Sequence, residues 1–260
     1  MRTSNPVLGD NVFSPTGYAA DGQAMTLQGT VNKCLILLGI ILASAWWVWG
    51  KVMQPAQVLG YEVEGLARHN QQAVLPIVFI AGIVGFVVAL ITVFKKEWSA
   101  VTAPVYALCE GLLLGGVSGL FEMMYPGIVM QAVVLTFGTL LCLLFAYKSG
   151  FIRVTDKFRL GVFAATAAIG LFYFVTWILG FFHVTVPFIN GGGIVGIGFS
   201  LFVVGIAALN LVLDFDMIER GAESGAPKYM EWYGAFGLMV TLIWLYMEIL
   251  RLLSKLRSRD

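Results

Sequence analysis

The stretch LNLVLDFDMIER, residues 209–220, ends one of the most apolar runs of the chain with two aspartates, Asp214 and Asp216. A carboxylate at membrane depth is costly unless it is paired, hydrated or protonated. The stretch therefore leaves two alternatives. Either both aspartates lie at the level of the lipid headgroups, or at least one of them has a function inside the membrane.

The composition of the chain is that of a polytopic membrane protein. Of its 260 residues, 59% are hydrophobic and 12% are charged, and the mean hydropathy is +0.86. In soluble domains about a quarter of the residues are charged. The net charge of +1 gives no reason to expect a nucleic-acid partner. Because the three cysteines lie far apart in apolar runs, we expect no disulfide framework and no zinc site. The two histidines, His69 and His183, lie in connecting segments, so no metalloenzyme is expected. No cofactor is expected either.

Seven apolar segments are long enough to cross the hydrocarbon core, which takes about 20 helical residues. They are expected at 34–53, 73–94, 100–121, 127–147, 159–181, 192–213 and 234–253. Backbone polar groups must be satisfied internally in lipid, so these segments are helices. The predicted fold class is an all-α integral membrane protein with seven transmembrane helices. The longer connection at 54–72 is expected to be a solvated loop.

The two ends of the chain give evidence on its orientation in the membrane. Residues 1–30 are polar and lack apolar periodicity, so we expect a flexible cytosolic tail before a membrane domain at 31–257. With the N-terminus inside, most of the 16 lysines and arginines flank the inner side. The basic C-terminal end fits this orientation poorly. It either lies outside despite its charge or follows a segment that does not fully cross.

Acidic residues within spans are functional candidates by default. Glu110 lies near the middle of the third span, and its alternative role is a protonated carboxyl that hydrogen-bonds a neighbouring helix. Asp214 has Asn210 and Ile218 one turn away on its own helix, a mostly apolar surrounding. This placement favours a function for Asp214.

Two other acids have local partners in the sequence. Asp216 has Arg220 at i+4, which predicts a solvated ion pair at the cytosolic end of the sixth span. Glu248 lies deep in the last span, with Arg251 at i+3 as a partner that extends toward the interface. For Glu248 the structural and the functional interpretation are equally favoured.

Small residues repeat every four positions in the third span, at Gly111, Gly115 and Gly119. Such a stripe predicts close helix packing rather than chemistry. A GxSG pattern includes Ser118 and resembles that of intramembrane serine proteases, for which His183 is the candidate partner. The serine falls in the glycine stripe and the histidine in a loop, so this alternative is disfavoured and no enzyme is expected.

Three stretches, APVYALCEGLLLGGVS (103–118), NLVLDFDMIE (210–219) and LYMEILRLL (245–253), together resemble the Bax-inhibitor-1 family of transmembrane Bax-inhibitor-motif proteins. The opening tail and the run that begins GAPKYMEWYGAFG are similar to its bacterial, YccA-like branch. The resemblance implies seven helices with the last one central. It also implies a multi-pass protein of the bacterial inner membrane.

The function that this resemblance implies is a pH-sensitive calcium leak, gated by two carboxylates on the sixth and seventh helices. They would be Asp214 and Glu248, the latter standing where the family has aspartate, with a longer segment between them. Close carboxylates in a low dielectric cannot both ionise easily. When both are ionised, they repel each other and offer oxygen ligands suited to calcium.

Three further charged residues have secondary roles in this interpretation. Glu110 would belong to the same ion pathway, and Asp216 with Arg220 would be secondary candidates. The YccA-like branch also implies an alternative function, a non-transporting modulator of a membrane-bound, ATP-dependent quality-control protease. That protease would be engaged through the N-terminal tail.

Overall fold

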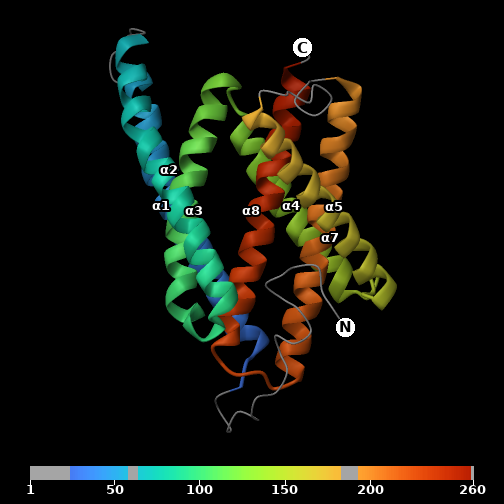
Figure 1. The fold of residues 1–260 in the computed structure, drawn as a ribbon. Helices are drawn as coiled ribbons and strands as arrows, with labels where there is room; N and C mark the ends of the chain where they lie inside the picture. The colour runs from blue at the N-terminus through green and yellow to red at the C-terminus, as the bar shows by residue number, and fades with distance from the viewer. Residues whose placement is uncertain (1–23, 58–63, 183–192, 259–260) are drawn as a thin grey trace. The chain divides into compact units, whose positions relative to one another are not determined.

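The protein is all-helical (Figure 1), and the computed structural model describes residues 24–57, 64–182 and 193–258. Seven long helices follow one another: α1 (Leu27–Gln57), α2 (Glu64–Phe94), α3 (Ser99–Met124), α4 (Ile128–Lys148), α5 (Asp156–Phe181), α7 (Ile194–Glu223) and α8 (Met230–Arg257). A short 3-10 turn, η2 (Lys96–Trp98), precedes α3. Each of the seven is long and apolar enough to cross a membrane, and the described residues contain no β-strand. The predicted fold class is confirmed.

Two helix boundaries differ from the expectation. The helix α2 begins at Glu64, so residues 64–72 of the expected solvated loop are helical. That segment is rich in residues that favour helices, such as Glu, Leu, Ala, Arg and Gln. The helix α7 continues to Glu223 instead of ending near residue 213. Both aspartates of the opening stretch therefore lie inside α7.

Most of the predicted N-terminal tail, residues 1–23, lies outside the described residues. The part that is described is anchored. Met25 donates a backbone hydrogen bond to Ala226 O at 2.6 Å, and α1 begins at Leu27, inside the range predicted for the tail. Thr26 bonds Glu231 Oε1 through both its backbone N (3.1 Å) and its hydroxyl (2.9 Å).

The chain divides into two compact units, and α8 contributes to both. The first, called the α1–α3 unit, consists of residues 18–127 and 225–239 as far as they are described. The second, called the α4–α7 unit, contains residues 128–224 and 240–260 in the same sense. Of the most apolar 18 residues of α8, 61% are buried, against at most 44% in every other span. The most buried helix is thus the last one, as the fold class requires.

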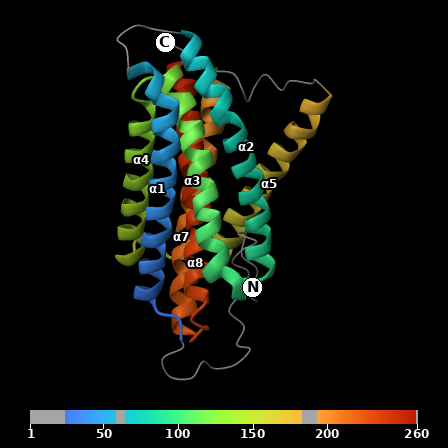
Figure 2. The same ribbon diagram turned by 90° about the vertical axis from the view of Figure 1, so that its left-hand side faces the viewer.

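Within the α1–α3 unit, the glycine stripe packs α3 against α1, and Figure 2 shows the two helices side by side. A methyl group at Gly115 would lie 2.8 Å from Ala45 Cα, and one at Gly119 would lie 2.8 Å from a Val52 methyl. Real methyl groups do not approach other atoms so closely. The prediction that these glycines serve packing is confirmed.

Candidate functional site

Contacts between α5 and α7 assign a level to each acid of the α4–α7 unit. Three pairs, each one seven residues further along α5, show that the two helices are antiparallel: Arg159 with Asp216, Thr166 with Asn210, and Tyr173 with Phe199. Seven residues are two helical turns, or about 10 Å. The position of a residue along α5 or α7 can therefore be counted from the nearest of these pairs.

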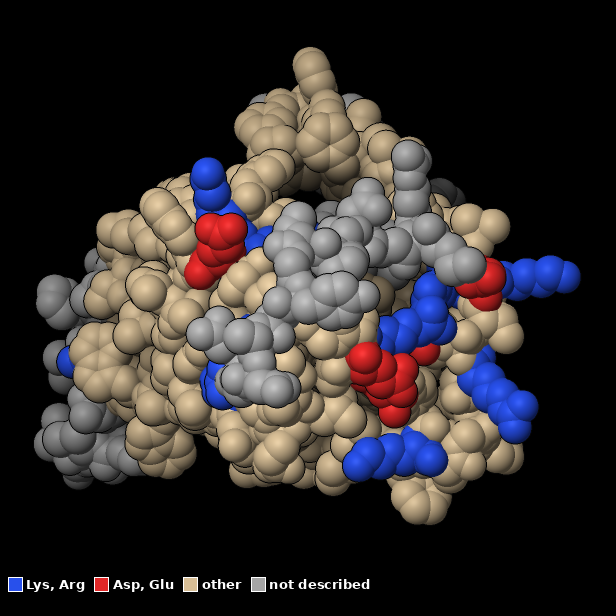
Figure 3. All heavy atoms as spheres, turned by 90° about the horizontal axis from the view of Figure 1, so that it is seen from below, with Lys and Arg blue, Asp and Glu red and all other residues tan. Residues whose placement is uncertain are grey.

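The first level is a buried ion-pair cluster near the end of α7. Asp216 is 7% exposed, and its Oδ2 contacts both the guanidinium of Arg159 and Arg220 Nε, the latter at 3.1 Å. In addition, Tyr147 of α4 donates a hydrogen bond to Glu219. In the view from the side on which α7 ends, acidic and basic side chains lie next to one another (Figure 3).

The predicted ion pair of Asp216 with Arg220 is confirmed, but the prediction that it is solvated is wrong. The carboxylate is buried because Arg159 of α5, itself 4% exposed, pairs with it from the next helix. Asp214 is still more buried, at 1% exposed. Both aspartates are therefore buried in the protein, whereas their level relative to the lipid headgroups stays a prediction.

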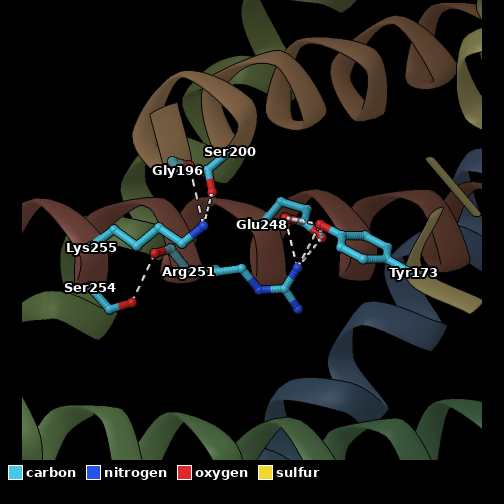
Figure 4. A network of polar contacts seen from close by, with 7 residues as sticks. All are labelled: Tyr173, Gly196, Ser200, Glu248, Arg251, Ser254 and Lys255. Carbon is cyan, nitrogen blue, oxygen red and sulfur yellow. Dashed lines mark hydrogen bonds and ion pairs between the residues drawn. The ribbon is translucent and has the colours of Figure 1, made fainter. Parts of the chain in front are cut away.

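The second polar level is formed by Glu248, which is 2% exposed (Figure 4). Its Oε1 accepts hydrogen bonds from Arg251 Nη1 at 3.0 Å and from Tyr173 OH at 3.1 Å. The same Nη1 donates to the Tyr173 hydroxyl at 2.7 Å, so the three side chains form a closed triangle between α5 and α8. The predicted partner Arg251 is confirmed, and Tyr173 was not foreseen.

An apolar layer separates these two levels. Ile169 of α5 packs with Val203 and Ile206 of α7, and all three are buried, with Trp244 of α8 against them. The layer leaves Asn210 and the ion-pair cluster on one side and the Glu248 triangle on the other. The unit thus alternates polar, apolar and polar levels along its helices.

Asp214 and Glu248 are not brought together in the described helices. Glu248 is bonded at the level of Tyr173, whereas Asp214 lies one turn beyond Asn210, which is bonded to Thr166. Along α5 and α7 this amounts to about 16 Å.

Beyond Glu248 lies a second cation of α8. Lys255 is 6% exposed, and its Nζ donates hydrogen bonds to Ser200 Oγ at 2.8 Å and to Gly196 O at 3.2 Å, both in α7. Lys255 is therefore held by α7, two helical turns beyond Glu248 on α8. Sequence reasoning missed the inward direction of Lys255, because a lysine near a helix end ordinarily extends to the interface.

Glu110 belongs to the α1–α3 unit. It is half-buried, and its carboxyl group hydrogen-bonds the hydroxyl of Tyr106, one turn earlier in α3. Tyr106 packs edge-on against Phe236, with ring centroids 4.9 Å apart. The hydrogen bond described for Glu110 is thus to its own helix rather than to a neighbouring one.

The residues of the disfavoured serine-protease alternative lie in different situations. Ser118 is 5% exposed in α3, within the stripe that packs on α1. His183 lies outside the described residues. The serine–histidine arrangement therefore stays untested.

Helices of this length and hydropathy, with the last one most buried, define a multi-pass membrane protein in contact with the lipid bilayer. The family model described as Bax inhibitor 1 like matches residues 5–258, nearly the whole chain. The protein belongs to this family. Comparison with curated proteins and with solved structures gave no match.

Proposed function

We propose that the protein is a pH-sensitive cation leak of the bacterial inner membrane, with calcium as a permeant ion. In this proposal it belongs to the YccA-like branch of the family and has a cytosolic N-terminus. The observation that supports it most is Glu248, a carboxylate that is 2% exposed in the most buried span. Ionisable groups are retained at such positions mainly along ion or proton pathways.

The alternation of levels in the α4–α7 unit adds to this argument. The apolar layer of Ile169, Val203 and Ile206 resembles the hydrophobic constrictions that close channels by excluding water. Acids lie on both sides of it, Asp214 on one and Glu248 on the other. A cation that passes the layer would find a carboxylate before and after it.

Protonation would act on this arrangement through Glu248. As a carboxylate, Glu248 accepts hydrogen bonds from Arg251 and Tyr173 and so ties α8 to α5. A neutral carboxyl group no longer offsets the charge of Arg251, whose side chain is 41% exposed and near enough to the surface to extend there. The tie between the two helices then weakens, and the leak changes with pH.

Calcium flux into proteoliposomes, measured between about pH 6 and 8, tests the proposal. Glu248→Gln removes the carboxylate that accepts from Arg251 and Tyr173, and Asp214→Asn removes the other buried carboxylate of the proposed path. Each is expected to reduce the difference in flux across this range. The matched control is Glu223→Gln, an exposed acid at the end of α7. A folded Glu248→Gln protein with the wild-type pH profile would contradict the proposal.

The double variant then separates two forms of the proposal. A proton shared between Asp214 and Glu248, as the resemblance implies, predicts that the second substitution adds little to the first. Their offset of about 16 Å along α5 and α7 predicts additive effects instead, as for independent sites. We expect additivity, and a double variant that equals either single variant would establish a shared proton.

The alternative function, modulation of a membrane-bound ATP-dependent protease, is favoured by the anchoring of the tail. Thr26 bonds Glu231 at the start of α8, and Lys33 Nζ contacts the same carboxylate at 3.0 Å. A pull on residues 1–23 would therefore be transmitted to α8. Removing residues 2–22 should abolish cross-linking to such a protease and leave the leak intact. Loss of flux with unchanged cross-linking would speak against both assignments.

A further inference from the structure

The ammonium group of Lys255 has an unusual position for a lysine near the end of a membrane helix. Such lysines ordinarily extend toward the headgroups and water. Lys255 lies two residues before the last residue of α8, yet it is 6% exposed and its Nζ points to α7 (Figure 4). Its hydrogen-bond acceptors are the Ser200 hydroxyl and the Gly196 carbonyl, and Ser200 is itself 1% exposed.

The surrounding charges do not explain this position. Arg251 lies one turn earlier on the same face of α8, where a like charge repels the ammonium. Gly196 lies in the first turn of α7, at the end of the helix where its dipole is positive. Among the described residues, Glu248 carries the favourable charge, and it is already bonded to Arg251. Neutral oxygens therefore hold Lys255 where the local charges oppose it.

Backbone carbonyl and hydroxyl oxygens are the groups that replace water around monovalent cations in channels. Calcium, by contrast, favours several carboxylates. We propose that Gly196 O and Ser200 Oγ form part of a monovalent-cation site, and that the Lys255 ammonium fills this site as a tethered plug of the leak. Its effect on flux rests on the proposed function, whereas occupation of the site does not.

The position of Lys255 along α8 agrees with its role as a plug. Lys255 lies two helical turns beyond Glu248, or about 10 Å nearer the C-terminal end of the helix. A cation that approaches Glu248 from that end meets the Lys255 ammonium first and is repelled by it. Because the local charges oppose the bound position, the side chain is poised to leave it for the interface.

Chemical rescue tests the site without any measurement of flux. In Lys255→Ala, methylammonium is expected to occupy the vacated position and to raise the melting temperature in detergent by about 2 °C or more. Tetramethylammonium at equal ionic strength should not, because it has no N–H donor. The wild type and the double variant Lys255→Ala with Ser200→Ala should respond to neither ion. Equal responses of Lys255→Ala to both ions would overturn the site.

Rubidium flux into proteoliposomes tests the plug. Lys255→Ala is expected to raise the flux about tenfold, which corresponds to about 1.4 kcal/mol. Arg257→Ala, which removes the same charge from an exposed position on α8, should leave the flux within twofold of the wild type. Rescue by methylammonium together with unchanged flux would overturn the plug. Absence of flux in every protein would overturn the proposed function, and the rescue experiment would still decide the site.

Discussion

At the residue scale, Asp216 forms ion pairs with two arginines whose side chains differ widely in solvent exposure. The side chain of Arg159 is 4% exposed, and that of Arg220 is 49% exposed. Removing one partner of a buried ion pair leaves an uncompensated charge, which costs about 3–5 kcal/mol, whereas an exposed pair contributes about 0–1 kcal/mol. The stabilising effect of Asp216 therefore comes mainly from the pair with Arg159.

We predict that Asp216→Asn lowers the free energy of unfolding in detergent by about 3 kcal/mol. Arg220→Gln should lower it by less than about 1 kcal/mol. The double variant Arg159→Met with Asp216→Leu should regain most of the loss, because apolar side chains then replace both charges. Denaturant titration followed by tryptophan fluorescence measures all three. Equal losses in Asp216→Asn and Arg220→Gln would contradict this account.

At the element scale, α1 and α3 depend on glycine for their close approach. Between membrane helices there is no hydrophobic driving force, so packing of backbone on backbone must supply the attraction. Gly115 lies against the backbone of Ala45, which cannot move without moving α1. By contrast, a methyl group at Gly138 in α4 would meet nothing within 4 Å. The two glycines are therefore a matched pair for testing this contact.

Gly115→Ala is predicted to lower the free energy of unfolding by about 1–3 kcal/mol, the usual cost of overpacking. Gly138→Ala should be neutral or slightly stabilising, because alanine favours the helix more than glycine does. Thermal unfolding in one detergent compares the two directly. If both substitutions shifted the melting temperature by the same amount, the contact of Gly115 with α1 would not be the cause of the loss.

At the scale of the whole molecule, α8 links the two units as one continuous helix. Its first turn carries Glu231, bonded to Thr26 and Lys33 in the α1–α3 unit. Its later turns carry Glu248 and Lys255, bonded to α5 and α7 in the α4–α7 unit. Unfolding of either unit therefore removes support from the same helix.

This continuity predicts one cooperative unfolding transition. Glu231→Gln, in the α1–α3 unit, and Asp216→Asn, in the α4–α7 unit, should each move the whole transition to a lower temperature. Scanning calorimetry in detergent, with circular dichroism as a second probe, tests this. A variant whose calorimetric trace splits into two peaks would show that the units unfold separately.

Features that depend on spacing along one helix could be predicted from the amino-acid sequence. The spans were visible because crossing lipid takes an uninterrupted apolar run of a certain length. Partners within one turn were visible for the same kind of reason, as with Arg220 for Asp216 and Arg251 for Glu248. The glycine stripe of α3 repeats every four residues, which aligns it on one face.

Contacts between side chains of different helices could not be predicted in this way and are seen in the folded protein. Arg159, Tyr173 and Ser200 are 57, 75 and 55 positions from the charged residues that they contact. Such contacts depend on the rotation and register of each helix, which packing sets and local sequence does not. The levels of Asp214 and Glu248 were decided in the same way, because α7 runs on to Glu223 through its charged end. At that end, Asp216 of α7 forms an ion pair with Arg159 of α5. No sequence pattern within α7 alone could indicate this partner.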